Sequence, residues 1–154
     1  MNYDNRHVVE RLQKKHGMSY KQACSVFQDT KRFLYMCGTI PGQWTPPDTI
    51  DIGWHEFGLF MKEYEDFCIK HFAHFIYHKP ATSDQPSDPN APKYTLQVAT
   101  NLFGEGVLGE NWYYLNEKGK PVLGPGIEKI GYIVLGDCSP GDSCGCGPGC
   151  SDPQ

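Results

Sequence analysis

Side chains that bind metal ions gather in the segment from Asp51 to His78. Four of the six histidines lie between Trp54 and His78, together with Cys68. Asp51 and His55 are four residues apart, so they lie on one face of a helix. Zinc takes imidazole, thiolate and carboxylate ligands, usually four of them. The pattern predicts that His55, Cys68 and His78 bind a zinc-like divalent ion, with Asp51 as the fourth ligand or as a partner of His55.

The same segment also fits a purely structural interpretation. Trp54 and the other aromatic residues around the histidines are typical of two helices packed against each other. If the later part of the segment is one continuous helix, Cys68, His71, His74 and His78 lie within an arc of about 120°, because each residue turns by about 100°. Metal binding and aromatic packing therefore both remain open at this point.

A second group of thiols lies in the C-terminal tail, residues 137–154, which is rich in glycine and proline. This composition does not support a packed helix or strand, so we expect the tail to be disordered unless a metal ion or a crosslink orders it. Four thiolates suffice for zinc or a cuprous ion. The candidates for a second metal site or a thiol site are Cys138, Cys144, Cys146 and Cys150.

The sequence supports catalysis less than it supports metal binding, because the standard catalytic motifs do not fit this segment. The zinc-protease helix needs a second histidine four residues after the first, and Leu59 stands at that position after His55. A metal-bound water at the two predicted histidine ligands, with Glu56 or Asp51 as the base, would still allow hydrolysis. Cys68 beside a histidine would give a nucleophile and its base, although no glycine-framed nucleophile motif surrounds it.

Length and composition are those of one folded domain. The chain has 154 residues, of which 39% are hydrophobic, and we assign residues 1–136 to a single domain. The net charge of −4 argues against general nucleic-acid binding. We see neither a secretory signal nor an apolar run of the roughly 20 residues that a membrane helix needs. We therefore expect a cytosolic protein whose seven cysteines are mostly reduced.

The elements that must position these residues are mainly helices, so the predicted class is mainly α (α+β). Ser19 and Gln22 form a capping box before the second helix, and Gly38 is expected to end it. Gly53 and Gly58 allow a bend or a break. Apolar residues at helical spacing predict helices over 5–16, 19–36, 47–57, 60–72 and 93–103, with a surface linker over 80–93. A small β-hairpin is predicted over 112–115 and 120–123, and a further short strand over 132–135.

A long run with a distinctive order of residues spans positions 47–80. It reads Pro47-x3-Asp51-x2-Trp54-His55-x-Phe57-x-Leu59-Phe60-x3-Tyr64-x2-Phe67-Cys68-x3-Phe72-x2-Phe75-Ile76-x-His78-x-Pro80. This run resembles a group of small uncharacterised bacterial proteins. That group is similar in turn to the glycine-rich domain-containing protein family of plants and fungi, which shares an Asp-x-x-Trp-His motif. The resemblance implies no established activity.

The resemblance helps to rank the candidate ligands. Similar proteins often have glycine where Ala73 stands, which affects no candidate ligand. His71 and His74 are peculiar to this chain, so they rank below the three predicted ligands His55, Cys68 and His78.

Three functions follow as hypotheses. We favour a cytosolic metal-binding or interaction module that recognises a protein or peptide partner, rather than an enzyme. A metal-dependent hydrolase with an open coordination position is the first alternative, and a pocket beside the site would favour it. The second alternative is a thiol carrier or a substrate for peptide modification, in which the cysteine-rich tail is the reactive part.

Overall fold

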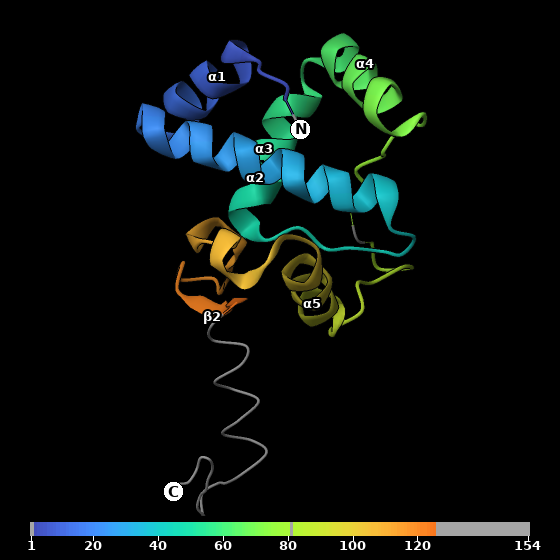
Figure 1. The fold of residues 1–154 in the computed structure, drawn as a ribbon. Coiled ribbons are helices and arrows are strands. Elements are labelled where there is room, and N and C mark those ends of the chain that lie inside the picture. The colour runs from blue at the N-terminus through green and yellow to red at the C-terminus, as the bar shows by residue number, and fades with distance from the viewer. Residues whose placement is uncertain (1, 81, 126–154) are drawn as a thin grey trace, which may run out of the picture.

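The structure, a computed structural model, describes residues 2–80 and 82–125, and within these the fold is mainly helical (Figure 1). The helices are α1 (Arg6–His16), α2 (Tyr20–Thr39), α3 (Asp48–Gly58), α4 (Met61–Phe72) and α5 (Ala91–Phe103), followed by the short 3-10 helices η1 (Glu105–Val107) and η2 (Glu110–Trp112). Strands β1 (Tyr114–Leu115) and β2 (Pro121–Leu123) form an antiparallel hairpin. The predicted fold class, five helices with a small hairpin, is therefore confirmed.

Local capping signals explain where the helices begin and end. The Ser19 hydroxyl accepts a hydrogen bond from the amide of Gln22, and the Gln22 side chain accepts one from the amide of Ser19, which is the predicted capping box. Gly17 ends α1 in the left-handed conformation, with φ of 66°. Ala73 ends α4 in the same conformation, with φ of 65°. This conformation strains a residue that carries a Cβ atom, and glycine would adopt it freely.

Two glycines act differently from the prediction. Gly38 does not end α2, which continues to Thr39; a Cβ atom at Gly38 would lie 2.5 Å from the ring of Phe72. Gly53 does not interrupt α3, which ends at Gly58, and a Cβ atom at Gly53 would be 2.1 Å from the hydroxyl of Thr30 on α2. Both glycines are thus places where two segments approach closely.

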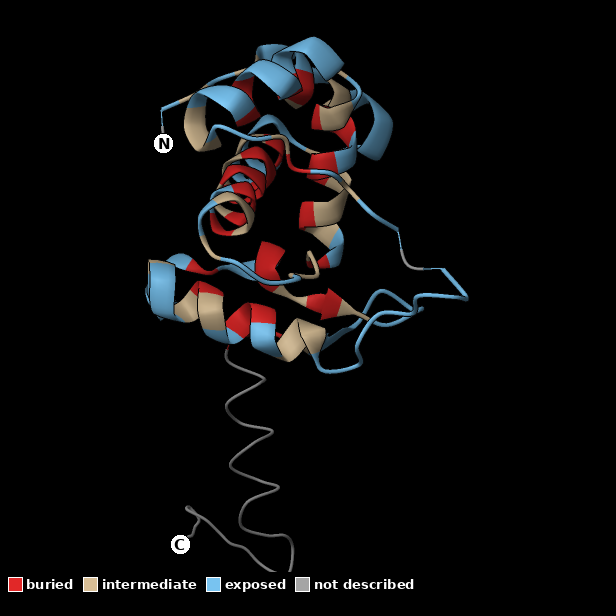
Figure 2. Ribbon diagram, turned by 90° about the vertical axis from the view of Figure 1, so that its right-hand side faces the viewer, coloured by how far each residue is buried: buried red, intermediate tan, exposed pale blue. Residues whose placement is uncertain are grey.

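The core forms where α2 crosses α3 and α4, and its centre is aromatic. Phe57 of α3 is fully buried and contacts Phe27, Tyr64 and Phe67, with ring centroids 5.1–5.3 Å apart. Edge-to-face pairs of this kind are favourable beyond the area that they bury. Figure 2 shows that buried residues concentrate in the middle of the molecule, whereas exposed residues cover its outer faces.

A buried carboxylate joins α1 to α3. Oε1 of Glu56 accepts one hydrogen bond from Nε of Arg11 at 2.5 Å, and its Oε2 lies 3.1 Å from Nε2 of His16. Burial alone would raise the pKa of Glu56, but the hydrogen bonds and charges of His16 and Arg11 outweigh it and lower the pKa. The side chain therefore stays ionised and holds the first helix against the helix that carries the candidate site.

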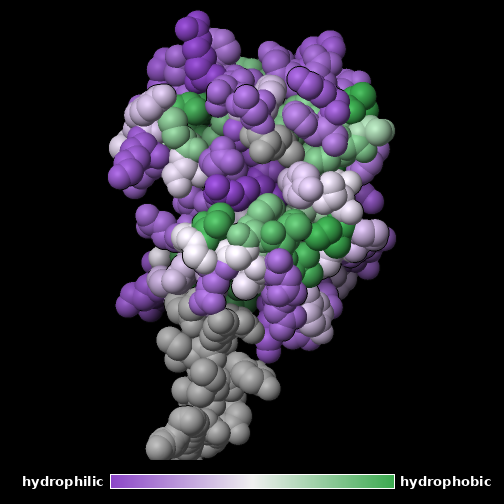
Figure 3. All heavy atoms as spheres, in the orientation of Figure 1, coloured by the Kyte–Doolittle hydropathy of each residue, from purple (hydrophilic) through white to green (hydrophobic). Residues whose placement is uncertain are grey.

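The outer surface is uneven in polarity. Figure 3 shows polar side chains over the upper helices, whereas apolar side chains gather in a band lower on the same face, at the level of α5. The exposed large apolar residues of α5 and η1 are Tyr94, Leu102 and Val107. No helix in the described part of the chain is both long and apolar enough to cross a membrane.

The close contact between α2 and α3 gives a test of the fold. Gly53→Ala forces a methyl group against Thr30, so we expect it to destabilise the protein by about 1–3 kcal/mol through overpacking. Gly58→Ala is the matched control, because nothing lies within 4 Å of a Cβ atom there, and we expect a change within about 1 kcal/mol. Urea denaturation of both variants measures the difference. Equal stability of the two variants would contradict the described packing of α3 on α2.

Candidate functional site

Asp51, His55 and His78 lie together at the surface of α3. Their ligand atoms all lie within 4.8 Å of one another. Nε2 of His78 is 2.6 Å from Oδ1 of Asp51, and Nδ1 of His55 is 3.5 Å from Oδ2 of Asp51. Asp51 and His55 come from adjacent turns of α3, whereas His78 comes from the segment that follows α4. Two segments far apart in sequence thus supply one cluster of candidate metal ligands.

The two imidazoles of the cluster differ in their surroundings. The ring of His78 lies 4.3 Å from that of Trp54 and 4.4 Å from that of His55, measured between centroids. The His78 side chain is 27% exposed, whereas that of His55 is 64% exposed. The cluster therefore has a packed side, formed by Trp54, and a side that is open to solvent.

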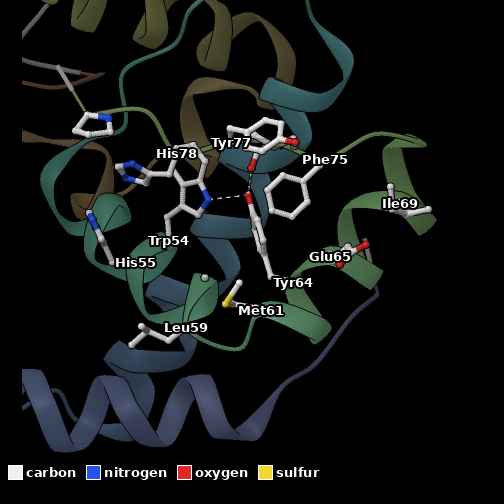
Figure 4. Close-up of a pocket in the computed structure, with 13 residues that line it drawn as sticks. Trp54, His55, Leu59, Met61, Tyr64, Glu65, Ile69, Phe75, Tyr77 and His78 are labelled. Atoms are coloured by element: carbon white, nitrogen blue, oxygen red, sulfur yellow. Dashed lines mark hydrogen bonds between the residues drawn. The ribbon is translucent and has the colours of Figure 1, made fainter. Parts of the chain in front are cut away.

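A pair of buried hydrogen bonds fixes the segment that carries His78. Nε1 of Trp54 donates to the Tyr64 hydroxyl at 2.8 Å, and that hydroxyl donates to the carbonyl oxygen of Ile76 at 2.6 Å (Figure 4). Burial is the main reason why the pKa of Tyr64 is strongly raised, so the hydroxyl keeps its proton. Because Ile76 is two residues before His78, this contact ties the position of His78 to α3 and α4.

A cavity of about 690 Å³ lies beside the cluster. His55 and His78 are part of its wall, and most of the remaining wall is apolar. Figure 4 shows the residues that line it, which come from the end of α3, from α4 and from the segment after α4. The lining consists of Trp54, His55, Gly58, Leu59, Met61, Tyr64, Glu65, Ile69, Phe75, Ile76, Tyr77, His78 and Pro80. Its volume lies in the range of small-molecule sites, about 300–1,000 Å³.

Cys68 does not join the cluster, contrary to the predicted geometry. It is fully buried, and its thiol interacts with the hydroxyl of Tyr64 and the backbone of Ile76. Burial raises the pKa of the Cys68 thiol, which disfavours the thiolate that a metal ion or an electrophile needs. The prediction went wrong because α4 turns this residue toward the interior of the molecule.

The two histidines that ranked lower also lie elsewhere. The imidazole of His71 packs on the ring of Phe67, with the ring centroids 4.8 Å apart. Burial lowers the pKa of His71. Its Nε2 is buried without a hydrogen-bond partner among the described residues. Nε2 of His74 lies 3.2 Å from the carbonyl oxygen of Gly38. An arc of Cys68, His71, His74 and His78 requires one continuous helix, whereas α4 ends at Phe72, close to the predicted end of this helix.

The other predicted participants fall into two groups. Glu56, considered as a base, is engaged with Arg11 and His16 and is not part of the cluster. Cys138, Cys144, Cys146 and Cys150 lie outside the described residues, as does the strand predicted over 132–135.

The sequence reasoning missed the role of Tyr64 and the cavity. The ring of Trp54 packs against that of His78. No spacing rule connects Trp54 to Tyr64, since they belong to different helices. The sequence nevertheless contains a signal. Trp54 and Tyr64 both carry hydrogen-bond donors and stand in a segment rich in apolar residues. Because such donors need partners when they are buried, a hydrogen bond between them could be expected.

Comparison with known proteins identifies a family. A family model described as UCP032817-like matches residues 2–99, and the chain belongs to this family. The matched region includes Asp51, His55 and His78, as well as the Trp54 and Tyr64 side chains that support them. No curated protein and no solved structure matches the chain.

Removal of one oxygen atom tests the support for His78. Tyr64→Phe leaves the indole N–H of Trp54 and the carbonyl of Ile76 buried without their partner, so we expect a loss of about 1–3 kcal/mol in unfolding free energy. Tyr77→Phe is the matched control, because Tyr77 is an exposed residue. Urea denaturation measures stability, and hydrogen–deuterium exchange should show faster exchange around residues 75–78 in Tyr64→Phe alone. If both variants behave as the wild type does, the hydroxyl does not fix this segment.

Proposed function

We propose that the protein binds a zinc-like divalent metal ion through Asp51, His55 and His78. The observation that carries the proposal is the convergence of one carboxylate and two imidazoles within 4.8 Å from two separate segments. Two histidines and a carboxylate are a common ligand set for zinc and for other transition metals. The cluster contains no thiolate, so the proposed ligand set differs from the one with Cys68.

The local geometry supports ion binding in two further ways. Oδ1 of Asp51 and Nε2 of His78 are already 2.6 Å apart, so small movements would bring both atoms to about 2.0–2.2 Å from one ion. Proton and ion would compete for these atoms, because a ligand must be deprotonated to bind a metal. The packing of His78 on Trp54 limits the freedom that the imidazole would lose on binding.

Three protein ligands leave a coordination position open on the solvent side. Structural zinc sites close all four positions with protein ligands, whereas catalytic sites keep one for water or substrate. Together with the adjacent cavity, this favours metal-dependent hydrolysis as the second candidate function. Asp51 would then hold the ion and Trp54 would exclude water from one side, and an ion in this position would make its bound water more acidic.

The interaction-module hypothesis also retains support. Leu59, Met61, Ile69 and Tyr77 are exposed apolar residues around one cavity, and such groups mark contact sites in soluble proteins. A relationship to the glycine-rich domain-containing proteins rests on the Asp51-x-x-Trp54-His55 motif. In this structure, Asp51 and His55 of the motif lie at the cluster, and Trp54 lies against Tyr64. The cytosolic location and the thiol role of the tail stay predictions.

Zinc titration of the full-length protein tests the proposal. We expect one zinc ion per chain at the cluster, measured by competition with a chromophoric chelator. Loss of a residue that only supports a metal ligand typically weakens metal binding about 10–100-fold. We expect His55→Ala and His78→Ala each to weaken zinc binding by more than this, because each removes a ligand. Asp51→Asn should weaken zinc binding at least about 10-fold. His74→Ala and Cys68→Ser are matched controls, since both residues lie outside the cluster, and they should bind zinc as the wild type does.

A further variant separates the two candidate sites. Replacement of Cys138, Cys144, Cys146 and Cys150 by serine should leave binding at the cluster unchanged. The opposite result would be that the His55→Ala and His78→Ala proteins bind zinc as tightly as the wild type, whereas the four-serine variant loses zinc binding. In that case the tail is the metal site and the proposal is wrong. Circular dichroism of each variant establishes that the fold is retained, as expected for an exposed residue such as His55.

A further inference from the structure

We propose that the cavity beside the cluster binds a small carboxylic acid with an apolar body, whose carboxylate completes the coordination of the ion. This inference rests on the proposed function, because the ion at Asp51, His55 and His78 is what recognises the carboxylate. It adds the chemical class of the ligand, which neither the family match nor the cluster supplies.

The apolar body follows from the wall of the cavity. Leu59 is 60% exposed and Met61 is 76% exposed, and both line the cavity together with Ile69, Phe75 and Tyr77. Exposed apolar surface gains free energy when a ligand removes it from water. A volume of about 690 Å³ accommodates a small molecule, and an apolar wall with few polar groups is typical of such sites.

The position of the head group follows from the distribution of charge. In Figure 4, His55 and His78 lie at one end of the view, and Glu65 lies near the opposite end. An ion of charge +2 held by the single carboxylate of Asp51 leaves a positive centre at the histidine end. A ligand carboxylate is attracted to that centre and repelled by Glu65 at the other end. The ligand would therefore enter with its carboxylate toward the ion and its apolar body along Trp54, Phe75 and the exposed lining residues Leu59 and Met61.

The structure also provides a reason for the open side of the cluster. His55 is more exposed than His78, so the coordination position that remains would lie on the solvent side of the cluster. His55 and His78 both line the cavity, so a ligand inside it would lie beside two of the three proposed ligands of the ion. An oxygen ligand suits such an ion at about 2.0–2.2 Å.

Calorimetric titration of the zinc-loaded full-length protein with octanoate, acetate and 1-octanol tests the inference. Octanoate carries both the apolar body and the carboxylate, whereas each of the other two compounds lacks one of them. We expect octanoate to bind at least about 10-fold more tightly than acetate, because added CH₂ groups are buried, and at least about 10-fold more tightly than 1-octanol. Without zinc, the advantage of octanoate over 1-octanol should disappear.

Variants of the wall provide a second measurement. Leu59→Gln and Met61→Gln should weaken octanoate binding by about 10-fold while leaving zinc affinity unchanged, because neither side chain is a ligand. Leu102→Gln makes the same chemical change on α5, at an exposed residue that does not line the cavity, and it should have no effect. Both wall residues are well exposed, so the variants are expected to fold.

The outcomes distinguish the two proposals. If zinc binds at the cluster but octanoate binds no better than acetate, the cavity does not take an apolar body and this inference is overturned, while the proposed function stands. If octanoate binds equally well with and without zinc, the contact between carboxylate and ion is overturned. If zinc does not bind to Asp51, His55 and His78 at all, the proposed function fails and the inference fails with it.

Discussion

The hydroxyl group of Tyr64 connects the parts of the molecule on which the candidate site depends. It accepts from the indole of Trp54 on α3, belongs itself to α4, and donates to the backbone of Ile76. All three groups are buried, so leaving any of them without its hydrogen-bond partner would destabilise the folded protein. The aromatic core around Phe57 places Tyr64 at this junction, because the two rings pack edge to face. A contact in the core thereby determines where a surface histidine, His78, is held.

The Asp-x-x-Trp-His motif gains a physical meaning from this arrangement. Along α3, Asp51 and His55 lie on the side of the cluster, while Trp54 turns toward Tyr64 and supports the ring of His78. Gly53, between them, lets α3 lie close against Thr30 of α2. Five consecutive residues thus combine a close helix contact, a buried hydrogen bond and two candidate ligands. The third candidate ligand, His78, comes from a distant segment.

Local signals were sufficient to predict the helices but not which side chains form the cluster. The capping box at Ser19 and Gln22 and the apolar spacing depend on neighbours in sequence, and the helices begin and end within a few residues of the predicted positions. The rotation of α4 depends on tertiary packing, so the inward position of Cys68 was not visible. The turn at Ala73, which redirects the chain toward α3, decides whether His78 belongs to the arc of α4 or to the cluster. The cavity arises from three segments together, and no single segment predicts it.

X-ray absorption at the zinc edge, on the full-length protein with one equivalent of zinc, tests the central claim most directly. The claim is that the ion lies among one carboxylate and two imidazoles and away from every thiol. The account predicts a first shell of nitrogen and oxygen atoms at about 2.0–2.2 Å, with the multiple-scattering features of imidazole. A sulfur atom in the first shell, at about 2.3 Å, would instead indicate Cys68 or the tail cysteines as ligands and would contradict the account.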